Sequence, residues 1–428
     1  METQKLYSWK LTEVFNKTGE TLIKVSAVLF AIAIPTSIAL DNLATGIGIL
    51  GLIFLIFTNK LNLPPFKPLT ILILSELPHY ITKPIKILKE TDFKQYLSSY
   101  FIGFHIASSK NFLRKTFIIL GISTTVLTFS IIFEALTGQN IKNINVSSLH
   151  ILKEGLFRPK GLLNHALTTG GVIYTLFFLF SAISFYFKEK KFAIFSLLAL
   201  IGLVFNQSRS YWLATSTFFF VIILPGIFMK NMKKYRKLAI TGISLTFFLC
   251  LSVFLYSPLK SRLFSITDVK YNSSNKDRLT IWTSYFYSFK NDYSLLEILI
   301  GKGRKAPQSA IKFGKEACIK FYPENLCSDK KYLMKIHKGI THNIYLKYFS
   351  KYGLIGLLAY LYFWFFFLKE NLKKFLKTKD PVFIIFFSGY VGFLIAGLFE
   401  NNFTDAEVQT AILFTLGINS YLLSIKTS

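Results

Sequence analysis

Long apolar runs separated by lysine-rich segments recur along this chain, and they limit the folds it can adopt. Ten runs are clear, and two shorter ones contain polar residues such as Glu76 and His105. Each clear run approaches the roughly 20 residues that a helix needs to cross about 30 Å of hydrocarbon. We therefore predict an all-α polytopic membrane protein with about twelve transmembrane helices. The clear runs are 23–40, 43–58, 116–136, 166–186, 192–207, 211–229, 238–256, 344–368, 381–398 and 408–424, and the weaker ones are 68–82 and 96–109.

The composition excludes an ordinary soluble protein. Of the 428 residues, 52% are hydrophobic and 46 are phenylalanine, and the mean hydropathy is +0.44. Average soluble domains are much less apolar. We treat residues 1–428 as a single membrane-embedded domain.

The net charge of +28 invites a nucleic-acid interpretation, but the positive charge lies in the loops between apolar runs. Lysine and arginine in short loops orient a membrane protein with those loops in the cytoplasm. Successive clusters are separated by two runs, so they fall on one face, and both termini are predicted to be cytoplasmic. Nucleic acid is not a predicted partner. The clusters are Lys188, Lys190 and Lys191; Lys230, Lys233, Lys234, Arg236 and Lys237; and Lys369, Lys373, Lys374, Lys377 and Lys379.

One connection is long: residues 257–343 form a predicted external loop between the ninth and tenth runs. Within it, SNKDRLTIWTSYFYSFKNDYSLLEILIGKG has helix-like spacing and ends in two glycines, so the loop is predicted to be partly helical. The loop contains 16 Lys and Arg against 7 Asp and Glu. This excess suggests an anionic partner such as phosphate-bearing membrane lipid, although a solvated lysine-rich surface would have the same composition.

Two cysteines, Cys318 and Cys327, lie nine positions apart in this loop. An external compartment would permit a disulfide between them. The spacing alone leaves both the oxidised and the reduced state open.

The stretch THNIYLKYFSKYGLIGLL, residues 341–358, opens the tenth run with a His-Asn pair. In a continuous helix, Gly353 lies about 20° from His342 around the axis and Gly356 about 40° to the other side. Small residues on one face let a neighbouring transmembrane helix approach closely. We predict a packed seam at Gly353 and Gly356, with His342 above it at the level of the external lipid phosphates.

Three side chains at the level of the external lipid phosphates are candidates for a catalytic or binding role. Histidine can accept a proton near neutral pH, so His342 is a candidate general base, although a histidine at a helix start can also be a cap. Arg209 and Arg278 are placed externally beside the membrane. Arginine binds phosphate bidentately and stays charged, which suits a diphosphate, whereas an interfacial anchor is the alternative role for each.

The sequence around these candidate residues resembles the motifs of a known protein family. HNIYLKYFSKYGLIGLL, with His342, Asn343, Gly353 and Gly356, resembles the signature of the O-antigen ligase and polymerase superfamily. QSRSYWLA, with Arg209, and KDRLTIW, with Arg278, resemble two further motifs of that family. RPKGLLNHA, with Arg158, and FENNFTDAE, with Glu400, are looser matches. The resemblance runs from about residue 155 onward, and it also covers the twelve-span layout and the large loop.

The resemblance implies a glycosyltransferase of the bacterial inner membrane with a periplasmic active site. It would move a glycan from an undecaprenyl diphosphate carrier to a hydroxyl of lipid A core oligosaccharide. Polymerases of the superfamily use another carrier-linked repeat as acceptor, and protein-directed members use Ser or Thr. No motif in the sequence identifies the acceptor.

The sequence lacks the motifs that ATP-dependent or metal-dependent chemistry would require. The chain has no G-x-x-x-x-G-K-[ST] phosphate loop and no external D-x-D or His/Cys ligand cluster, so ATP, a metal and other cofactors are not predicted. The alternative from another class is a flippase for lipid-linked glycans. Charged residues in mid-membrane and similarity between the two halves would favour that alternative, whereas here the polar candidates gather at one external face.

Overall fold

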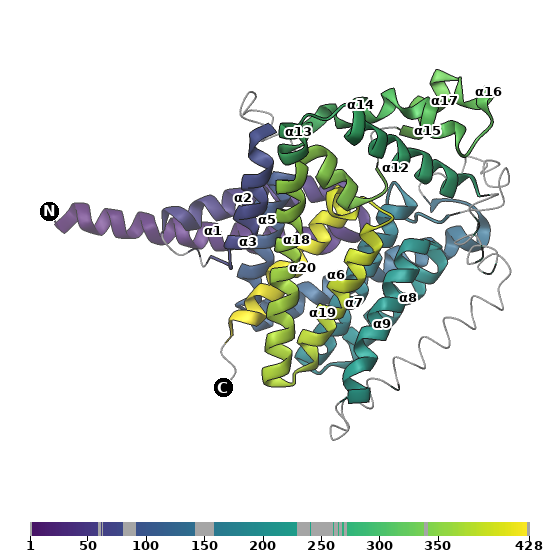
Figure 1. The fold of residues 1–428 in the computed structure, drawn as a ribbon. Helices are drawn as coiled ribbons and strands as arrows, with labels where there is room; N and C mark the ends of the chain where they lie inside the picture. The colour runs from purple at the N-terminus through teal and green to yellow at the C-terminus, as the bar shows by residue number, and fades with distance from the viewer. Residues whose placement is uncertain are drawn as a thin grey trace.

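The computed structural model describes residues 2–58, 61, 63–79, 91–141, 158–228, 240, 260, 264, 268, 272–337 and 341–425. Regular structure within these residues is entirely helical, as predicted (Figure 1). The helices of the bundle are α1 (Glu2–Thr36), α2 (Ile38–Phe57), α3 (Lys67–Glu76), η1 (Leu77–His79), α5 (Thr91–Ala107), α6 (Lys110–Thr137), α7 (Ala166–Phe187), α8 (Lys190–Asn206), α9 (Arg209–Phe228), α18 (Ile344–Thr378), α19 (Pro381–Gly397), η5 (Asn402–Thr404) and α20 (Ala406–Ser424).

The predicted apolar runs coincide with helices wherever the structure describes them. Within the described part of the chain, five helices are long and apolar enough to cross a membrane: α1 from Thr12 onward, α2, α6, α7 and α18. The run predicted at 238–256 lies outside the described residues except for Ile240. The count of twelve transmembrane helices therefore stays a prediction.

α7 is the central helix of the bundle. In its most apolar stretch of 18 residues, 89% of the residues are buried within the protein. It packs against α8, α19 and α20, while α1 pairs with α2 and α5 pairs with α20. The α5–α20 contact is close because Gly103 faces the backbone of Phe414, and Gly417 faces the backbone of Tyr100. Small residues at such crossings let two helix backbones approach each other.

The helix that follows His342 is not the straight helix that we predicted. α18 is kinked at Gly353, whose φ of 68° and ψ of −166° are not helical. A Cβ at Gly353 would lie 2.3 Å from the carbonyl oxygen of Leu299, and one at Gly356 would lie 2.2 Å from Cβ of Tyr352. The predicted seam with a neighbouring transmembrane helix is therefore wrong at Gly353, where the close neighbour is the backbone at the end of the short helix Leu295–Ile300, and at Gly356, where it is the preceding turn of α18.

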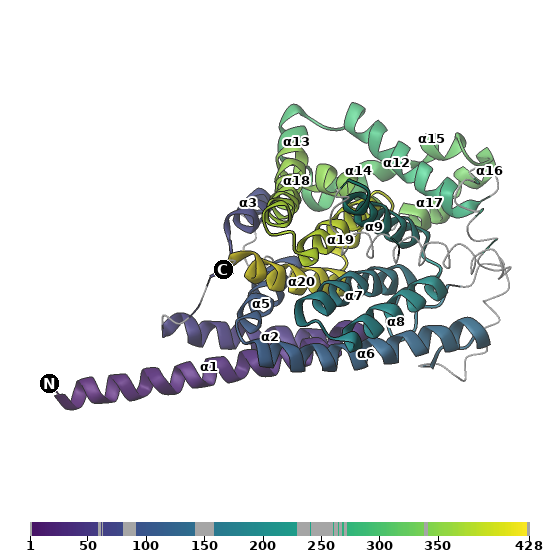
Figure 2. The ribbon, with the colours of Figure 1, turned by 90° about the horizontal axis from the view of Figure 1, so that it is seen from below.

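Residues 272–337 form a layer of short helices over one end of the bundle (Figures 1 and 2). Lys302 donates to a carboxylate oxygen of Asp292 over 2.6 Å, and Lys312 donates to the other oxygen over 2.9 Å. Cys318 and Cys327 form a disulfide, which resolves the question that the spacing left open. The layer contains α12 (Ser273–Asn291), α13 (Leu295–Ile300), η4 (Gly303–Lys305), α14 (Ala306–Lys312), α15 (Gly314–Ile319), α16 (Glu324–Cys327) and α17 (Lys330–His337).

Candidate functional site

A buried carboxylate, Glu400, lies at the centre of a polar cluster where the helix layer meets the bundle. Its Oε1 accepts a hydrogen bond from Nη2 of Arg278 over 2.9 Å and another from Oγ of Ser210 over 3.1 Å. Its Oε2 lies 3.8 Å from Nδ1 of His342, within ion-pair range but longer than a hydrogen bond. Glu400 thus connects groups from α9, α12 and the start of α18.

The backbone of His342 has a φ of 49°, a left-handed conformation that is uncommon for residues with a side chain. The residues on either side hold this turn. Oδ1 of Asn401 accepts from the hydroxyl of Thr341 over 2.6 Å and from the backbone N–H of Asn343 over 3.2 Å. Nε1 of Trp282 donates to the carbonyl oxygen of Thr341 over 2.9 Å.

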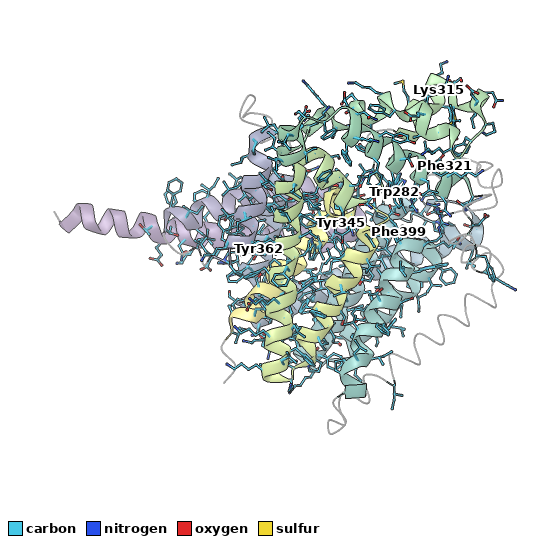
Figure 3. The ribbon with its side chains drawn as sticks, viewed as in Figure 1. Trp282, Lys315, Phe321, Tyr345, Tyr362 and Phe399 are labelled. Carbon is cyan, nitrogen blue, oxygen red and sulfur yellow. A yellow bond between two sulfur atoms is a disulfide. The ribbon has the colours of Figure 1, made fainter. Side chains whose placement is uncertain are left out.

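The side chain of Asn343 caps the helix that follows. Its Oδ1 accepts from the backbone N–H of Leu346 over 2.9 Å, as expected for an asparagine at an N-cap. Tyr345, in the first turn, donates from its hydroxyl to the carbonyl oxygen of Leu394 on α19 over 2.8 Å. Tyr345 of α18 and Trp282 of α12, two helices that contact each other, are labelled in Figure 3 together with Phe399. The imidazole is therefore presented by a turn that is fixed from both sides.

Arg209 is the first residue of α9 and is only 8% exposed. The preceding turn contains Gln207, whose φ of 58° is left-handed, and only Gln207 and Ser208 separate α8 from α9. Nη2 of Arg209 donates to Oδ1 of Asn275 over 3.0 Å. Asn275 lies three residues before Arg278 on α12, so one helix of the layer contacts both the α9 arginine and Glu400.

Arg158 lies in a turn that is anchored to the bundle. Oε2 of Glu134 accepts from the backbone N–H groups of Lys160 and Gly161 over 3.0 and 2.6 Å. Nδ2 of Asn206, the last residue of α8, donates to the carbonyl oxygen of Pro159 over 2.7 Å. The Arg158 turn and the α8–α9 turn that precedes Arg209 are therefore joined directly.

The electrostatic balance of the cluster favours an ionised Glu400. Burial by itself raises the pKa of the Glu400 carboxyl, but Arg278, His342 and Ser210 outweigh it, so that the pKa lies below its ordinary value. The carboxylate is therefore negatively charged at neutral pH.

The arginines repel one another. Burial lowers the pKa of Arg209 from its ordinary value to about 10, and the nearby guanidinium groups of Arg278 and Arg158 contribute to the decrease. Burial and Arg278 also lower the pKa of Arg158. Three guanidinium groups within electrostatic reach of one another exceed the single charge of Glu400. This excess suits a multiply charged anion such as a diphosphate.

The structure brings together five of the residues singled out in the sequence: His342, Arg158, Arg209, Arg278 and Glu400. Asn343 adjoins this cluster as a cap, whereas Gly353 and Gly356 belong to the kink of α18. Among the described residues, no group of three or more His, Cys, Asp and Glu side chains could hold a metal ion. Metal-independent and ATP-independent chemistry stays a prediction.

Sequence reasoning missed three residues that support the cluster. Ser210 donates to Glu400, Asn275 accepts from Arg209, and Asn401 holds the His342 turn. Each lies in or beside a motif already singled out: QSRSYWLA, KDRLTIW or FENNFTDAE. Each is a polar residue within three positions of an arginine or glutamate already singled out, and this proximity could have indicated them.

Residues 194–361 match the family described as O-Antigen ligase. The resemblance predicted from the motifs is therefore confirmed over this stretch, which contains Arg209, Arg278 and His342 and leaves Arg158 and Glu400 outside. No curated protein matches the chain at a significant level. Together with the apolar helices, the match supports a membrane enzyme of the glycosyltransferase type.

Proposed function

We propose that this chain, which carries the O-antigen ligase family region over residues 194–361, transfers a glycan from an undecaprenyl diphosphate carrier to lipid A core oligosaccharide. One observation carries the proposal: Glu400 contacts both a histidine and an arginine at the centre of a group of three arginines. A glycosyl transfer from a diphosphate needs a base and cations placed close together.

His342 is the proposed general base. Its Nδ1 faces Glu400, so a proton on Nδ1 leaves Nε2 as the acceptor for the proton of the acceptor hydroxyl. As that proton moves to Nε2, the hydroxyl oxygen forms a bond to the anomeric carbon of the donor glycan. The bond between this carbon and the diphosphate oxygen breaks, and its electron pair leaves with undecaprenyl diphosphate. The proton that His342 has gained is then released to solvent.

The three arginines are the proposed diphosphate ligands. Negative charge builds up on the departing diphosphate, and fixed guanidinium groups stabilise it without reorganising. Arg209 and Arg278 are held by Asn275 and Glu400 before any substrate binds. This preorganisation favours the departing state over the bound donor. In this mechanism, no protein-bound metal ion or nucleotide takes part.

The location of the cluster agrees with a periplasmic reaction. The starts of α7, α9, α18 and α20 meet at one end of the bundle. Ser210 and His342 both face Glu400, and Thr168 of α7 donates to Asp405, which precedes α20. The lysine clusters between the helices support a cytoplasmic location for the opposite end and for both termini. We therefore propose an inner-membrane enzyme with its site on the periplasmic side.

Lipid A core is the proposed acceptor. A polymerase or a protein-directed transferase of the same superfamily would use the same base and cations, so the acceptor separates these alternatives. A flippase would instead move the donor unchanged.

Reconstitution of the protein distinguishes a ligase from a polymerase, a protein-directed transferase and a flippase. The purified protein in liposomes receives an undecaprenyl diphosphate-linked glycan together with lipid A core, a Ser/Thr peptide, or no added acceptor. We expect glycan on lipid A core only, loss of transfer in His342→Ala, and full transfer in Lys315→Ala, which changes an exposed residue of α15 (Figure 3). Longer carrier-linked glycan would indicate a polymerase, a glycosylated peptide would indicate a protein-directed enzyme, and absence of any transfer would refute the proposal.

A further inference from the structure

The short helix α13 presents an apolar surface away from the protein. Its sequence is LLEILI, and the side chains of Leu295, Leu296 and Leu299 are 78%, 62% and 40% exposed. Positions i, i+1 and i+4 lie on one side of a helix. On the preceding helix, Phe286 is 64% exposed. Water is an unfavourable environment for such a group of large side chains.

The contacts of α13 fix its depth along α18. The backbone N–H of Lys302 and the hydroxyl of Tyr293 donate to the carbonyl oxygen of Ser350 over 3.0 and 3.1 Å. The backbone at Leu299 lies directly against Gly353, where a Cβ would meet its carbonyl oxygen at 2.3 Å. Gly353 is the point at which the long apolar arm of α18 begins. The end of α13 is therefore level with the kink of α18, nine residues after the start of this candidate transmembrane helix.

The apolar surface of α13 continues onto two neighbouring helices. α18 points Leu354, Ile355 and Leu358 outward, at 39%, 50% and 55% exposed. α3 points Ile71 and Leu74 outward, at 41% and 56% exposed.

α3 is linked to α13 through η1. Nε2 of His79 lies 2.6 Å from the carbonyl oxygen of Ile300, at hydrogen-bond distance. Figure 2 shows α3 and α13 beside α18. The outward face of a long apolar helix in a membrane protein is lipid-facing, and α13 extends that face.

Charged residues flank the apolar surface. Lys290, Arg304 and Lys305 are exposed and lie just before and just after α13. Glu297, the acidic residue within the helix, is engaged in a capping box with Ser294. Lysine and arginine beside an apolar helix can keep their charge at the level of lipid phosphates while the apolar face is buried.

We propose that α13 is an interfacial anchor, with Leu295, Leu296 and Leu299 inserted among the acyl chains of the bilayer leaflet that faces the helix layer. The occupant is bulk membrane lipid. The helix layer is then held to the membrane at the kink of α18, and α12, which carries Arg278, is held at the level of the lipid headgroups. This inference does not depend on the reaction that the protein catalyses.

Site-directed spin labelling tests the anchor in the full-length protein. In a Cys250→Ser background, a nitroxide is attached at Leu296→Cys, and the protein is placed in nanodiscs of phosphatidylethanolamine and phosphatidylglycerol that contain no polyprenyl lipid. Two further labels serve as controls for comparison. One is at Leu358→Cys on the outward face of α18, and the other is at Met334→Cys on α17, where Met334 is 56% exposed. If Leu296→Cys does not assemble, Leu295→Cys replaces it.

We expect the label at 296 to resemble the label at 358, with relaxation by oxygen and little relaxation by a water-soluble nickel chelate. Its ratio of oxygen to nickel accessibility should exceed that of the label at 334 several-fold. Nickel accessibility equal to that at 334 would refute insertion. Protection from both reagents would show that a second copy of the chain covers α13, and would refute the lipid assignment. Insertion only after a polyprenyl phosphate is added would also refute it.

Discussion

Nδ1 of His342 lies 3.8 Å from Oε2 of Glu400, while Oε1 of the same carboxylate accepts hydrogen bonds from Arg278 and Ser210. One carboxylate thus contacts the proposed base and one of the proposed diphosphate ligands. Such an arrangement orients the imidazole and fixes its tautomer, as the third group of a catalytic triad does.

Glu400→Gln should reduce turnover more than donor binding, because the amide keeps the shape of the side chain but loses the charge that faces Nδ1. We expect kcat to fall by about tenfold or more, a part of the roughly 10² to 10⁴ that a positioned base contributes. The KM for the donor should not rise, since the cluster gains net positive charge. Steady-state kinetics in liposomes measure both values. His342→Ala sets the upper limit of the loss, and a Glu400→Gln enzyme with unchanged kcat would remove Glu400 from the mechanism.

Replacing Arg209 or Arg278 with lysine should weaken donor use, because an ammonium group does not reproduce the planar, bidentate guanidinium. Hydrogen bonds to charged groups contribute about 1.5–3 kcal/mol, so we expect kcat/KM for the donor to fall by roughly 10- to 100-fold in each variant. Lys315→Ala, on the exposed part of α15, is the control for a substitution outside the cluster. Full activity in both lysine variants would instead assign the arginines to interfacial anchoring.

Gly353→Ala should destabilise the protein and reduce transfer. With φ of 68° and ψ of −166°, Gly353 lies in a region that is essentially restricted to glycine, where other residues cost about 1–3 kcal/mol. The new Cβ would also clash with the backbone of Leu299. Thermal unfolding in detergent and hydrogen exchange of residues 293–303 measure the effect.

Gly46→Ala is the matched control, since a Cβ at Gly46 meets nothing within 4 Å. It should leave the melting temperature unchanged or raise it, because alanine is the better helix former. Equal melting temperatures for the two variants would contradict the role assigned to the kink.

Removing the disulfide should loosen α15 to α17 without disabling the site. Cys318 and Cys327 close a short loop, and such a link contributes typically about 2–4 kcal/mol to the stability of the region it joins. We expect faster hydrogen exchange in residues 314–337 of the Cys318→Ser, Cys327→Ser double variant, with transfer largely retained. A reducing agent should reproduce this effect in the wild-type protein and have none in the double variant.

Much of the bundle could be predicted from the sequence because its signals are local. A run such as 166–186 is long enough and apolar enough to specify α7 by itself. The predicted site residues also come together, since Arg209 begins one helix, His342 lies just before another, and such ends gather at one level of a bundle.

The kink at Gly353 could not be predicted in this way. A helical wheel assumes an unbroken helix, whereas the conformation of Gly353 depends on backbone that lies about fifty residues earlier, at Leu299. The disulfide was undecided for a similar reason: the distance between Cys318 and Cys327 depends on how α15 and α16 turn. Non-local contacts determine both features.

The left-handed backbone at His342 affects how libraries of variants at this position should be interpreted. Bulky β-branched replacements such as valine strongly disfavour a φ of 49°, so they would distort the turn as well as remove the imidazole. Glycine and asparagine accept this conformation readily. In a saturation library, these two report the loss of the side chain's chemistry alone, and the remaining replacements report chemistry and backbone tolerance together.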